Sequence, residues 1–402
     1  MALMPVAEAY AAVLKDARGL PEEMVALTDA HHRTLSRDIA ALRTQPPADM
    51  SAMDGYAVRA ADAVAGARLK VIGEVAAGRP FSATIGAGQA ARIFTGGVVP
   101  DGADAVVIQE DASQDGDTVI VNEAIAAGKN IRPAGIDYRE GEVGLRRGSL
   151  LNDRALALAA GMNHPQLPVH RRPRVAILAT GDELVAPGTT PASGQIVYSN
   201  FFALSALVRS ESAEAIDLGI ARDTLESTSH GIRRARDLCV DVLVTTGGAS
   251  VGDHDLVQEA LNAEGFDMAF WKIALRPGKP MMHGRLGPMR VLGLPGNPVS
   301  SYVCAFLFLV PLIRALSGRT TVDHSFEYAV LGRELPANDK RQDYLRARLE
   351  NGRDGLPVAI SVGAQDSSLV GNLAASDALI VRPPFAPAAP AGSPCTILRL
   401  PN

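Results

Sequence analysis

The sequence predicts a multidomain protein built around a doubly wound α/β domain, with smaller β domains before and after it. The chain has 402 residues, more than one domain of about 100–200 residues accommodates. Between residues 173 and 318, apolar runs alternate with segments of helical spacing. This alternation is typical of a parallel sheet covered by helices on both faces. Elsewhere, short apolar runs between glycines and prolines predict β domains.

The composition is that of an ordinary globular protein. Hydrophobic residues make up 47% of the chain and charged residues 21%, and the formal net charge is −5. A chain with negative net charge does not attract DNA or acidic membrane surfaces as a whole, so we expect neither nucleic acid nor a membrane as partner. An anionic ligand would need a local cluster of cations.

The cysteines are few and far apart. Cys239, Cys304 and Cys395 form no C-x-x-C pair, which argues against a disulfide framework and a zinc site. The N-terminal segment lacks the basic start of a secretion signal. We therefore expect a reducing, cytoplasmic location.

The N-terminal part of the chain changes pattern twice. Residues 1–45 have helical spacing, including residues 38–43, and Pro46 and Pro47 end it. Residues 51–140 carry short apolar runs between glycines and predict a small β domain. Helical spacing returns over 146–167, and the basic, proline-containing segment 169–174 predicts a domain boundary.

The alternation within the α/β domain gives its elements in order. The predicted strands are 175–180, 215–220 and 241–246, and the predicted helices are 199–212, 224–238 and 253–265. The uncharged segment 291–313 is long enough to suggest a membrane span, but Pro295 and Pro298 interrupt it, which favours a buried strand, a turn and a core helix. Apolar runs from 327 to 400 predict a C-terminal β domain.

A glycine loop follows the third of these strands. Residues 245–255, TTGGASVGDHD, place Gly247 and Gly248 where backbone N–H groups can hold an oxyanion. The loop matches neither the ATP-type P-loop nor the dinucleotide fingerprint, and tight packing alone remains an alternative. The same segment ends with Asp253 and Asp255, whose carboxylates would repel a bound phosphate unless a cation lies between them.

Other polar residues fall at the same predicted edge of the sheet. Gly181, Asp182 and Glu183 directly follow the strand 175–180, and ligands of such sheets bind at the carboxyl ends of the strands. For either acid alone, a turn or helix cap is an equal alternative.

A basic cluster and a stiff turn come later in this domain. Lys272, Arg276 and Lys279 alternate with apolar residues, and Pro295 and Pro298 stiffen a turn after a strand. This pattern favours a shaped anion pocket over a solvated basic face.

In the first half, Asp54, Thr95 and Asp137 lie in turn-rich segments, and each alone indicates no more than a turn. Together with the later segments, however, they form an ordered series. The series consists of SAMDGYAV, TGGVVPDGADAVV, NIRPAGID, ILATGDEL, TTGGASVGDHD, WKIALRPGKP and LPGNPVS. In this order the motifs resemble the molybdopterin molybdotransferases, the bacterial MoeA proteins and the gephyrin E domain, over essentially the whole chain.

The resemblance implies an elongated, L-shaped subunit whose first two domains are interleaved. The implied domains are a helical N-terminal and linker domain (1–22, 41–46 and 141–172), a small β domain (23–40 and 47–140), an α/β molybdopterin-binding domain similar to molybdopterin adenylyltransferases (173–318), and a C-terminal β barrel-like domain (319–402). It also implies a homodimer, with each active site shared between the α/β domain of one subunit and the small β domain of the other.

The resemblance further implies a role in molybdenum cofactor biosynthesis. Such a transferase receives adenylylated molybdopterin from the adenylyltransferase, hydrolyses its phosphoanhydride with Mg²⁺, and inserts molybdate. It releases AMP and molybdenum cofactor, which pass to downstream cofactor-modifying enzymes or molybdoenzymes. A bound Mg²⁺ would explain carboxylates beside a phosphate loop, because Mg²⁺ is held by one or two carboxylates plus ligand phosphates.

Site residues follow from the resemblance position by position. The implied catalytic acids are Asp54, Asp137, Glu183, Asp223 and Asp255, of which Asp223 and Asp255 are the implied metal ligands. The implied substrate- or cofactor-binding residues are Thr95, Thr180, Gly181, Gly247, Gly248, Ser250, Lys272, Arg276, Lys279, Pro295, Asn297, Pro298, Arg346 and Ser367.

Two departures from the family pattern stand out. Tyr198 occupies a position where relatives often carry an acid, and Arg276 stands where many carry lysine. The second change keeps the charge but alters its geometry.

Two other functions are alternatives to the transferase. A molybdopterin adenylyltransferase would consume ATP, and the additional N-terminal and C-terminal regions argue against it. A gephyrin-like scaffold would bind receptor-loop peptides, but this sequence shows no fused adenylyltransferase domain or long linker. The transferase is the expected function.

Overall fold

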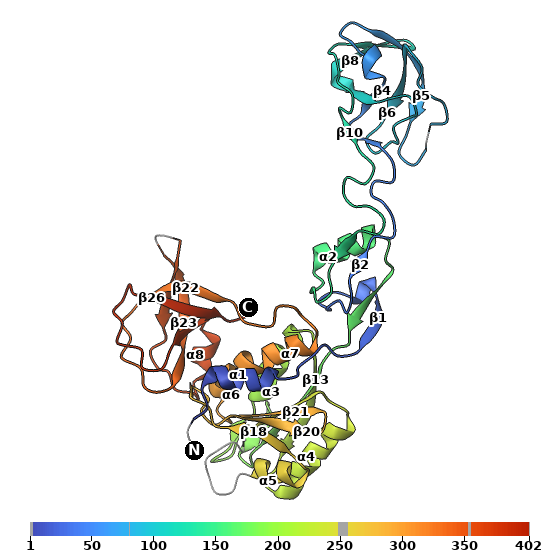
Figure 1. Cartoon of the computed structure of the whole chain (residues 1–402). Helices are drawn as coiled ribbons and strands as arrows, with labels where there is room; N and C mark the ends of the chain where they lie inside the picture. Colours follow the sequence, from blue (N-terminus) through green and yellow to red (C-terminus); the bar gives the residue numbers. More distant parts are fainter. Residues whose placement is uncertain (1–2, 80, 248–255, 353–354, 402) are drawn as a thin grey trace.

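The computed structural model describes residues 3–79, 81–247, 256–352 and 355–401. The molecule is elongated and bent, as Figure 1 shows. A small β unit at one end is joined by two adjacent chain segments to a small helical unit. The helical unit adjoins the α/β domain, and the C-terminal β domain lies beside the α/β domain.

The distal unit is a six-stranded sheet with strand order β7-β4-β6-β5-β9-β8. Its strands are β4 (Gly55–Val58), β5 (Arg68–Val75), β6 (Gln89–Ile93), β7 (Ala105–Ile108), β8 (Ala112–Asp115) and β9 (Thr118–Val121), and the pair β3 (Met50–Ser51) and β10 (Ile131–Arg132) lies at its base. Val58, Leu69 and Val107 are buried in its core. The six strands of this sheet lie within residues 51–140, where the short apolar runs predict a small β domain.

The helical unit contains two short strand pairs and one helix. These elements are β1 (Glu22–Ala26) with β12 (Gln166–His170), β2 (Ile39–Ala40) with β11 (Val143–Leu145), and α2 (Asp153–Gly161). The side chain of Asn152 caps α2 by accepting a hydrogen bond from the Ala155 N–H at 2.9 Å.

The prediction of helical structure through residue 45 was wrong beyond the first helix. Residues 22–26 form a strand, and residues 38–43 contain β2 instead of a helix. Ile39 and Ala41 are buried while Leu42 is exposed, so the apolar side chains follow the two-residue period of extended chain. Pairing with β11 and packing near α2 override the local helical preference.

The α/β domain has a six-stranded sheet with strand order β16-β13-β17-β21-β20-β18. The first four strands in this order are parallel, and β20 and β18 add antiparallel pairings. The strands are β13 (Arg174–Thr180), β16 (Glu214–Ala221), β17 (Val242–Thr246), β18 (Asp267–Trp271), β20 (Met282–Leu286) and β21 (Met289–Leu294). The predicted strands all occur, which confirms the doubly wound sheet.

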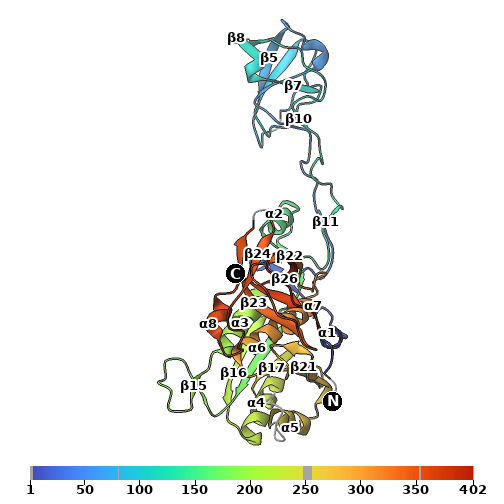
Figure 2. The same ribbon diagram turned by 90° about the vertical axis from the view of Figure 1, so that its left-hand side faces the viewer.

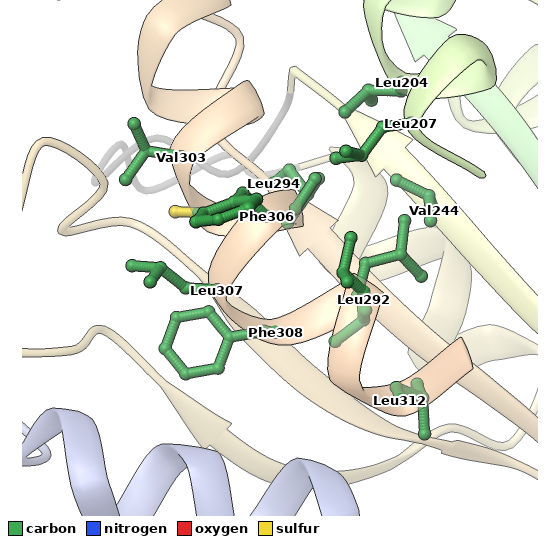
Figure 3. Close-up of a cluster of buried hydrophobic side chains, with 14 of the residues drawn as sticks. Leu204, Leu207, Val244, Leu292, Leu294, Val303, Phe306, Leu307, Phe308 and Leu312 are labelled. Carbon is green, nitrogen blue, oxygen red and sulfur yellow. The ribbon is translucent and has the colours of Figure 1, made fainter. Parts of the chain in front are cut away.

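Helices cover both faces of this sheet. One face packs against α1 (Val6–Leu14), α3 (Asn200–Ser210), α6 (Pro298–Cys304) and α7 (Val310–Leu316), and the other packs against α4 (Leu225–Asp237) and α5 (Leu256–Ala263). Figure 3 shows the first core, in which Leu204 and Leu207 of α3 meet Val244, Leu292 and Phe306. The continuous apolar runs of the strands are therefore explained by burial on two sides.

The uncharged segment forms the strand, turn and helix that the sequence predicts. After β21, the helix runs from Pro298 to Leu316 through a π-helical stretch, Ala305–Leu309. This helix is long and apolar enough to cross a membrane, but 83% of its most apolar window is buried inside the protein. It serves as the central core helix of the α/β domain.

The C-terminal domain is a closed barrel of five strands, β23-β24-β22-β26-β25, closed by pairing of β23 with β25. Its elements are β22 (Phe326–Leu331), β23 (Gln342–Asn351), β24 (Pro357–Ser361), β25 (Ala378–Arg382), β26 (Pro394–Arg399) and the short helix α8 (Val370–Ala374). A short strand of the α/β region, β19 (Leu275–Arg276), pairs with the start of β23. The α/β domain and the barrel are therefore joined by strand pairing as well as by the chain itself.

Candidate functional site

A cleft of about 600 Å³ opens at the carboxyl ends of the parallel strands. Thr180 ends β13, Thr246 ends β17, and Pro295 follows β21, and all three residues line the cleft. Ser368 and Val370 of the C-terminal domain line it as well. The structure thus brings together the strand ends that the sequence placed at one edge, and adds a wall from the barrel.

Gly247 lies where only glycine fits. Its φ is +95°, a region that L side chains rarely adopt. A Cβ at this position would lie 2.5 Å from the Thr180 carbonyl oxygen and 2.8 Å from its Oγ1. The start of the glycine loop therefore packs directly on the end of β13. Gly248, Ser250 and Asp255 lie outside the described residues.

Two threonine hydroxyls in the cleft lack protein partners. Within the described part of the chain, Oγ1 of Thr180 and Oγ1 of Thr246 are buried without a hydrogen bond. Buried polar groups are nearly always paired, so these hydroxyls are suited to bind a ligand. Thr246 was not among the predicted residues, although its place at the end of a strand directly before the glycines was a usable signal.

Acidic residues follow two neighbouring strands. The Asp182 N–H donates to Oδ2 of Asp223 at 3.3 Å, and the Asp223 N–H donates to Oδ1 of Asp182 at the same distance. Both side chains are exposed, and the neighbouring Glu183 lines the cleft. Among the residues whose placement is described, no group of three His, Cys, Asp or Glu could hold a metal ion.

The stiff turn after β21 links the two walls of the cleft. Nδ2 of Asn297 donates to Oγ of Ser367 at 2.9 Å, and the Val299 N–H donates to the Ser367 carbonyl at 3.1 Å. On the other side, Nδ2 of Asn200 donates to the Gly296 carbonyl at 2.8 Å. The structure therefore brings together the turn of Asn297 and Pro298 with Ser367, and Asn200 is an addition to the residues that the sequence indicated.

Arg346 lies on β23 and is completely buried. Its Nη2 donates to the Ala364 carbonyl at 3.4 Å, whereas Nε and Nη1 have no partner within the described ranges. Burial lowers the pKa of the guanidinium, but arginine remains protonated in proteins. A buried cation with two unpaired nitrogens is costly unless an anion joins it.

The basic cluster is divided between different environments. Nζ of Lys272 lies 3.9 Å from the centre of the Trp271 ring, and Lys279 is exposed. Arg276 instead binds the C-terminal domain, where its Nη2 donates to Asp343 and, at 3.0 Å, to Oδ1 of Asn338. Its guanidinium therefore ties the barrel to the α/β domain.

Three predicted residues lie away from the cleft. In the distal unit, Oδ1 of Asp54 accepts hydrogen bonds from the N–H and hydroxyl of Thr95 at 2.7 and 2.8 Å. These bonds hold the pKa of Asp54 below its usual range. Asp137 lines a separate cavity of about 310 Å³ with Arg43 and Gln45. Within one chain the distal unit is remote from the α/β domain, which carries the cleft (Figures 1 and 2).

Tyr198, where the resemblance implies an acid in many relatives, packs inward. It is buried, its ring centre lies 6.4 Å from that of Phe201 and 6.5 Å from that of Phe202, and burial raises its pKa. The residues before it form the segment between β14 (Leu184–Val185) and β15 (Ile196–Val197), which projects from the α/β domain in Figure 2. Ile196 and Val197 of this segment line the cleft.

Comparison with protein families gives three consecutive matches. Residues 4–162 match the MoeA N-terminal region (domain I and II), residues 176–315 match a probable molybdopterin binding domain, and residues 328–400 match the MoeA C-terminal region (domain IV). Together the matched regions span most of the chain.

Curated proteins and a solved structure agree over nearly the full length. The chain is 35% identical to the molybdopterin molybdenumtransferase of Haemophilus influenzae over 89% of both chains. It is 37% identical to that of a Nostoc species, covering 94% of this chain and 89% of the relative. The crystal structure of the molybdopterin biosynthesis MoeA protein from Pyrococcus horikoshii is 29% identical and covers all of both chains with a TM-score of 0.87.

Proposed function

We infer that this chain, which belongs to the MoeA family of molybdopterin molybdenumtransferases, is an enzyme of molybdenum cofactor biosynthesis that transfers molybdenum to molybdopterin. In detail, the proposed reaction hydrolyses the phosphoanhydride of adenylylated molybdopterin and inserts molybdate into the dithiolene. AMP and molybdenum cofactor are the products. An adenylyltransferase supplies the substrate, cofactor-modifying enzymes or molybdoenzymes receive the product, and the location is the cytoplasm.

The observation that carries this proposal is the buried guanidinium of Arg346, whose hydrogen-bonding capacity is only partly used. Its Nε and Nη1 lack partners in the described structure, and its strand is hydrogen-bonded to the segment that ends in Ser367. Ser367 is in turn tied to the Asn297 turn at the cleft. An arginine and a hydroxyl are suitable donors for a small oxyanion, and molybdate is the oxyanion that this family's reaction requires.

The acids at the sheet edge fit a divalent cation. Asp182 and Asp223 present carboxylate oxygens at the ends of two adjacent strands, and such oxygens are the ligands that Mg²⁺ prefers. We propose Asp223, together with Asp255, as the residues that hold Mg²⁺, with Asp182 orienting Asp223. Bound there, Mg²⁺ would supply charge neutralisation at the phosphoanhydride.

The residues of the cleft have separate proposed roles. The hydroxyls of Thr180 and Thr246 are the proposed donors to a polar ligand group, which their lack of partners within the described chain supports. Gly247 lets the loop backbone approach that ligand closely, because a Cβ there would strike Thr180. Glu183 borders the cleft, where a carboxylate can orient water or accept its proton.

We further propose a homodimer whose active sites are shared. Asp54 and Thr95 are hydrogen-bonded to each other in the distal unit. In both views this unit lies far from the α/β domain of its own chain, which carries the cleft. A second copy would bring its distal unit to this cleft, as a two-fold symmetric pair does for both sites at once.

The test is a reconstituted reaction with adenylylated molybdopterin, MgCl₂ and molybdate, in which AMP and molybdenum cofactor are measured together. We expect both products from the wild-type protein. Arg346→Met is expected to raise the KM for molybdate at least about tenfold, because a charge-assisted contact is lost. ATP consumption with free molybdopterin, and no reaction with the adenylylated form, would instead indicate an adenylyltransferase.

A further inference from the structure

We propose that Gln365 is a positioning residue, which holds the segment 362–369 against β23 and thereby sets Ser367 relative to the Arg346 guanidinium for oxyanion binding. The inference rests on the proposed function, because it assigns the oxyanion to Arg346. It concerns a residue that neither the motifs nor the charge pattern indicated.

The side-chain amide of Gln365 makes three hydrogen bonds to the backbone. Its Oε1 accepts from the Arg346 N–H at 3.0 Å, and its Nε2 donates to the Arg346 carbonyl and to the Val362 carbonyl, each at 3.0 Å. Both backbone groups of Arg346 are therefore bound by one side chain. A residue held in this way has little freedom to shift along the strand.

These bonds occur where the strand ladder ends. The pairing of β23 with β24 begins at Ala347 and Ser361, and the Val362 N–H still donates to the Arg346 carbonyl at 2.9 Å. Beyond this point the backbone turns away, and the Gln365 side chain supplies the next contacts to β23. It thus fastens an irregular segment to a regular strand.

The other end of the segment is fastened to the α/β domain. Ser367 binds Asn297 and Val299, so the segment spans from the barrel to the turn at the cleft. Directly before Gln365, the Ala364 carbonyl accepts from Nη2 of Arg346 at 3.4 Å and from Nδ2 of Asn372 at 2.8 Å. Between the two attachments, the Asp366 carboxylate accepts, within the described residues, only from the N–H and hydroxyl of Ser368. The position of Ser367 relative to the guanidinium therefore depends on Gln365.

Two substitutions separate hydrogen bonding from packing. Gln365→Met keeps the length of the side chain and removes all three bonds. Gln365→Glu keeps an acceptor for the Arg346 N–H but directs a carboxylate oxygen at two carbonyls, an arrangement that becomes favourable only when the carboxyl is protonated and can donate. If Gln365 acted only by packing, molybdate binding by Gln365→Glu would not depend on the protonation of the new carboxyl group.

The experiment measures molybdate binding to the full-length protein by titration calorimetry and steady-state kinetics with saturating adenylylated molybdopterin. Gln365→Met is expected to weaken molybdate binding and raise its KM about tenfold, with kcat nearly unchanged. Gln365→Glu is expected to bind molybdate more tightly as pH is lowered, relative to wild type and Gln365→Met at the same pH values.

Gln342→Met is the matched control, because Gln342 lies on the same strand and its Nε2 donates to the Tyr344 hydroxyl at 2.7 Å. It is expected to bind molybdate like the wild type. Wild-type binding by Gln365→Met, or an equal loss in both methionine variants, overturns the inference. If Arg346→Met loses binding while Gln365→Met does not, the oxyanion site stands and only the role of Gln365 fails. Wild-type binding by Arg346→Met overturns both.

Discussion

At the scale of single residues, the cleft combines groups that a sequence can reveal with groups that only the fold exposes. Thr180, Glu183 and Gly247, which line the cleft, were predictable because strand ends of a parallel sheet meet at one edge. The unpaired nitrogens of Arg346 were not, because they result from closure of a barrel by strands distant in sequence. The role of Gln365 could not be predicted either, because its hydrogen-bond partners are backbone groups, which no sequence motif reveals.

Gly247→Ala tests the close approach of the glycine loop to β13. The new Cβ would meet the Thr180 carbonyl at 2.5 Å, and the positive φ adds strain of about 1–2 kcal/mol. We expect the KM for adenylylated molybdopterin to rise at least about tenfold, because displacing the loop removes ligand contacts.

Gly265→Ala is the control for strain alone, because Gly265 has φ +89° in the same domain but open space around its Cβ position. It is expected to lower the melting temperature without changing KM. Equal kinetic effects of the two substitutions would show that contact with Thr180 is unimportant.

At the scale of secondary-structure elements, the periodicity of apolar residues and the positions of turn residues predicted the α/β domain well. Its strands are buried on both faces, so their apolar runs are continuous, and the helices between them keep helical spacing. The same reasoning failed at residues 22–26 and 38–43. Those segments are too short for a stable period and take their extended form from pairing with strands more than 100 residues away.

We expect the free energy of unfolding to fall at low pH because of His283, which is buried on strand β20. This histidine of β20 is 2% exposed, and its Nδ1 lies 2.9 Å from the Val291 carbonyl oxygen. Burial, followed by the nearby charges of Arg290 and Arg285, lowers its pKa from 6.5 to about 4. Because the unfolded chain binds this proton more readily, stability is present above pH about 6.5 and is lost as pH falls toward about 4.

The measurement is the free energy of unfolding by urea at several pH values between these limits. The wild type should lose about 2–3 kcal/mol from this group, and His283→Gln should show a shallower pH dependence. The exposed His230 of α4 provides the control, and His230→Gln should behave like the wild type. Equal slopes for His283→Gln and the wild type would contradict the assignment.

At the scale of the whole molecule, the candidate site is divided. The distal unit carries Asp54 and Thr95, whereas Gly247 and Glu183 line the cleft of the α/β domain and Arg346 lies on β23 of the barrel. Figure 1 shows the distal unit far from the α/β domain in one chain. Local sequence patterns could not predict this layout, because the chain runs out to the distal unit and back. Only the resemblance to a known family supplied the interleaved order and the expectation of a shared site.

The most direct test of the shared site compares two mixed dimers made by co-expression with different tags. In the first, one chain carries Asp54→Ala and the other carries Arg346→Met. In the second, one chain carries both substitutions and the other is wild type. Activity is measured with molybdate well below the KM of an Arg346→Met site. If each site takes its distal unit from the partner, the first dimer keeps one intact site and about half of the wild-type activity, and the second keeps almost none. Half activity in the second dimer and none in the first would contradict the account.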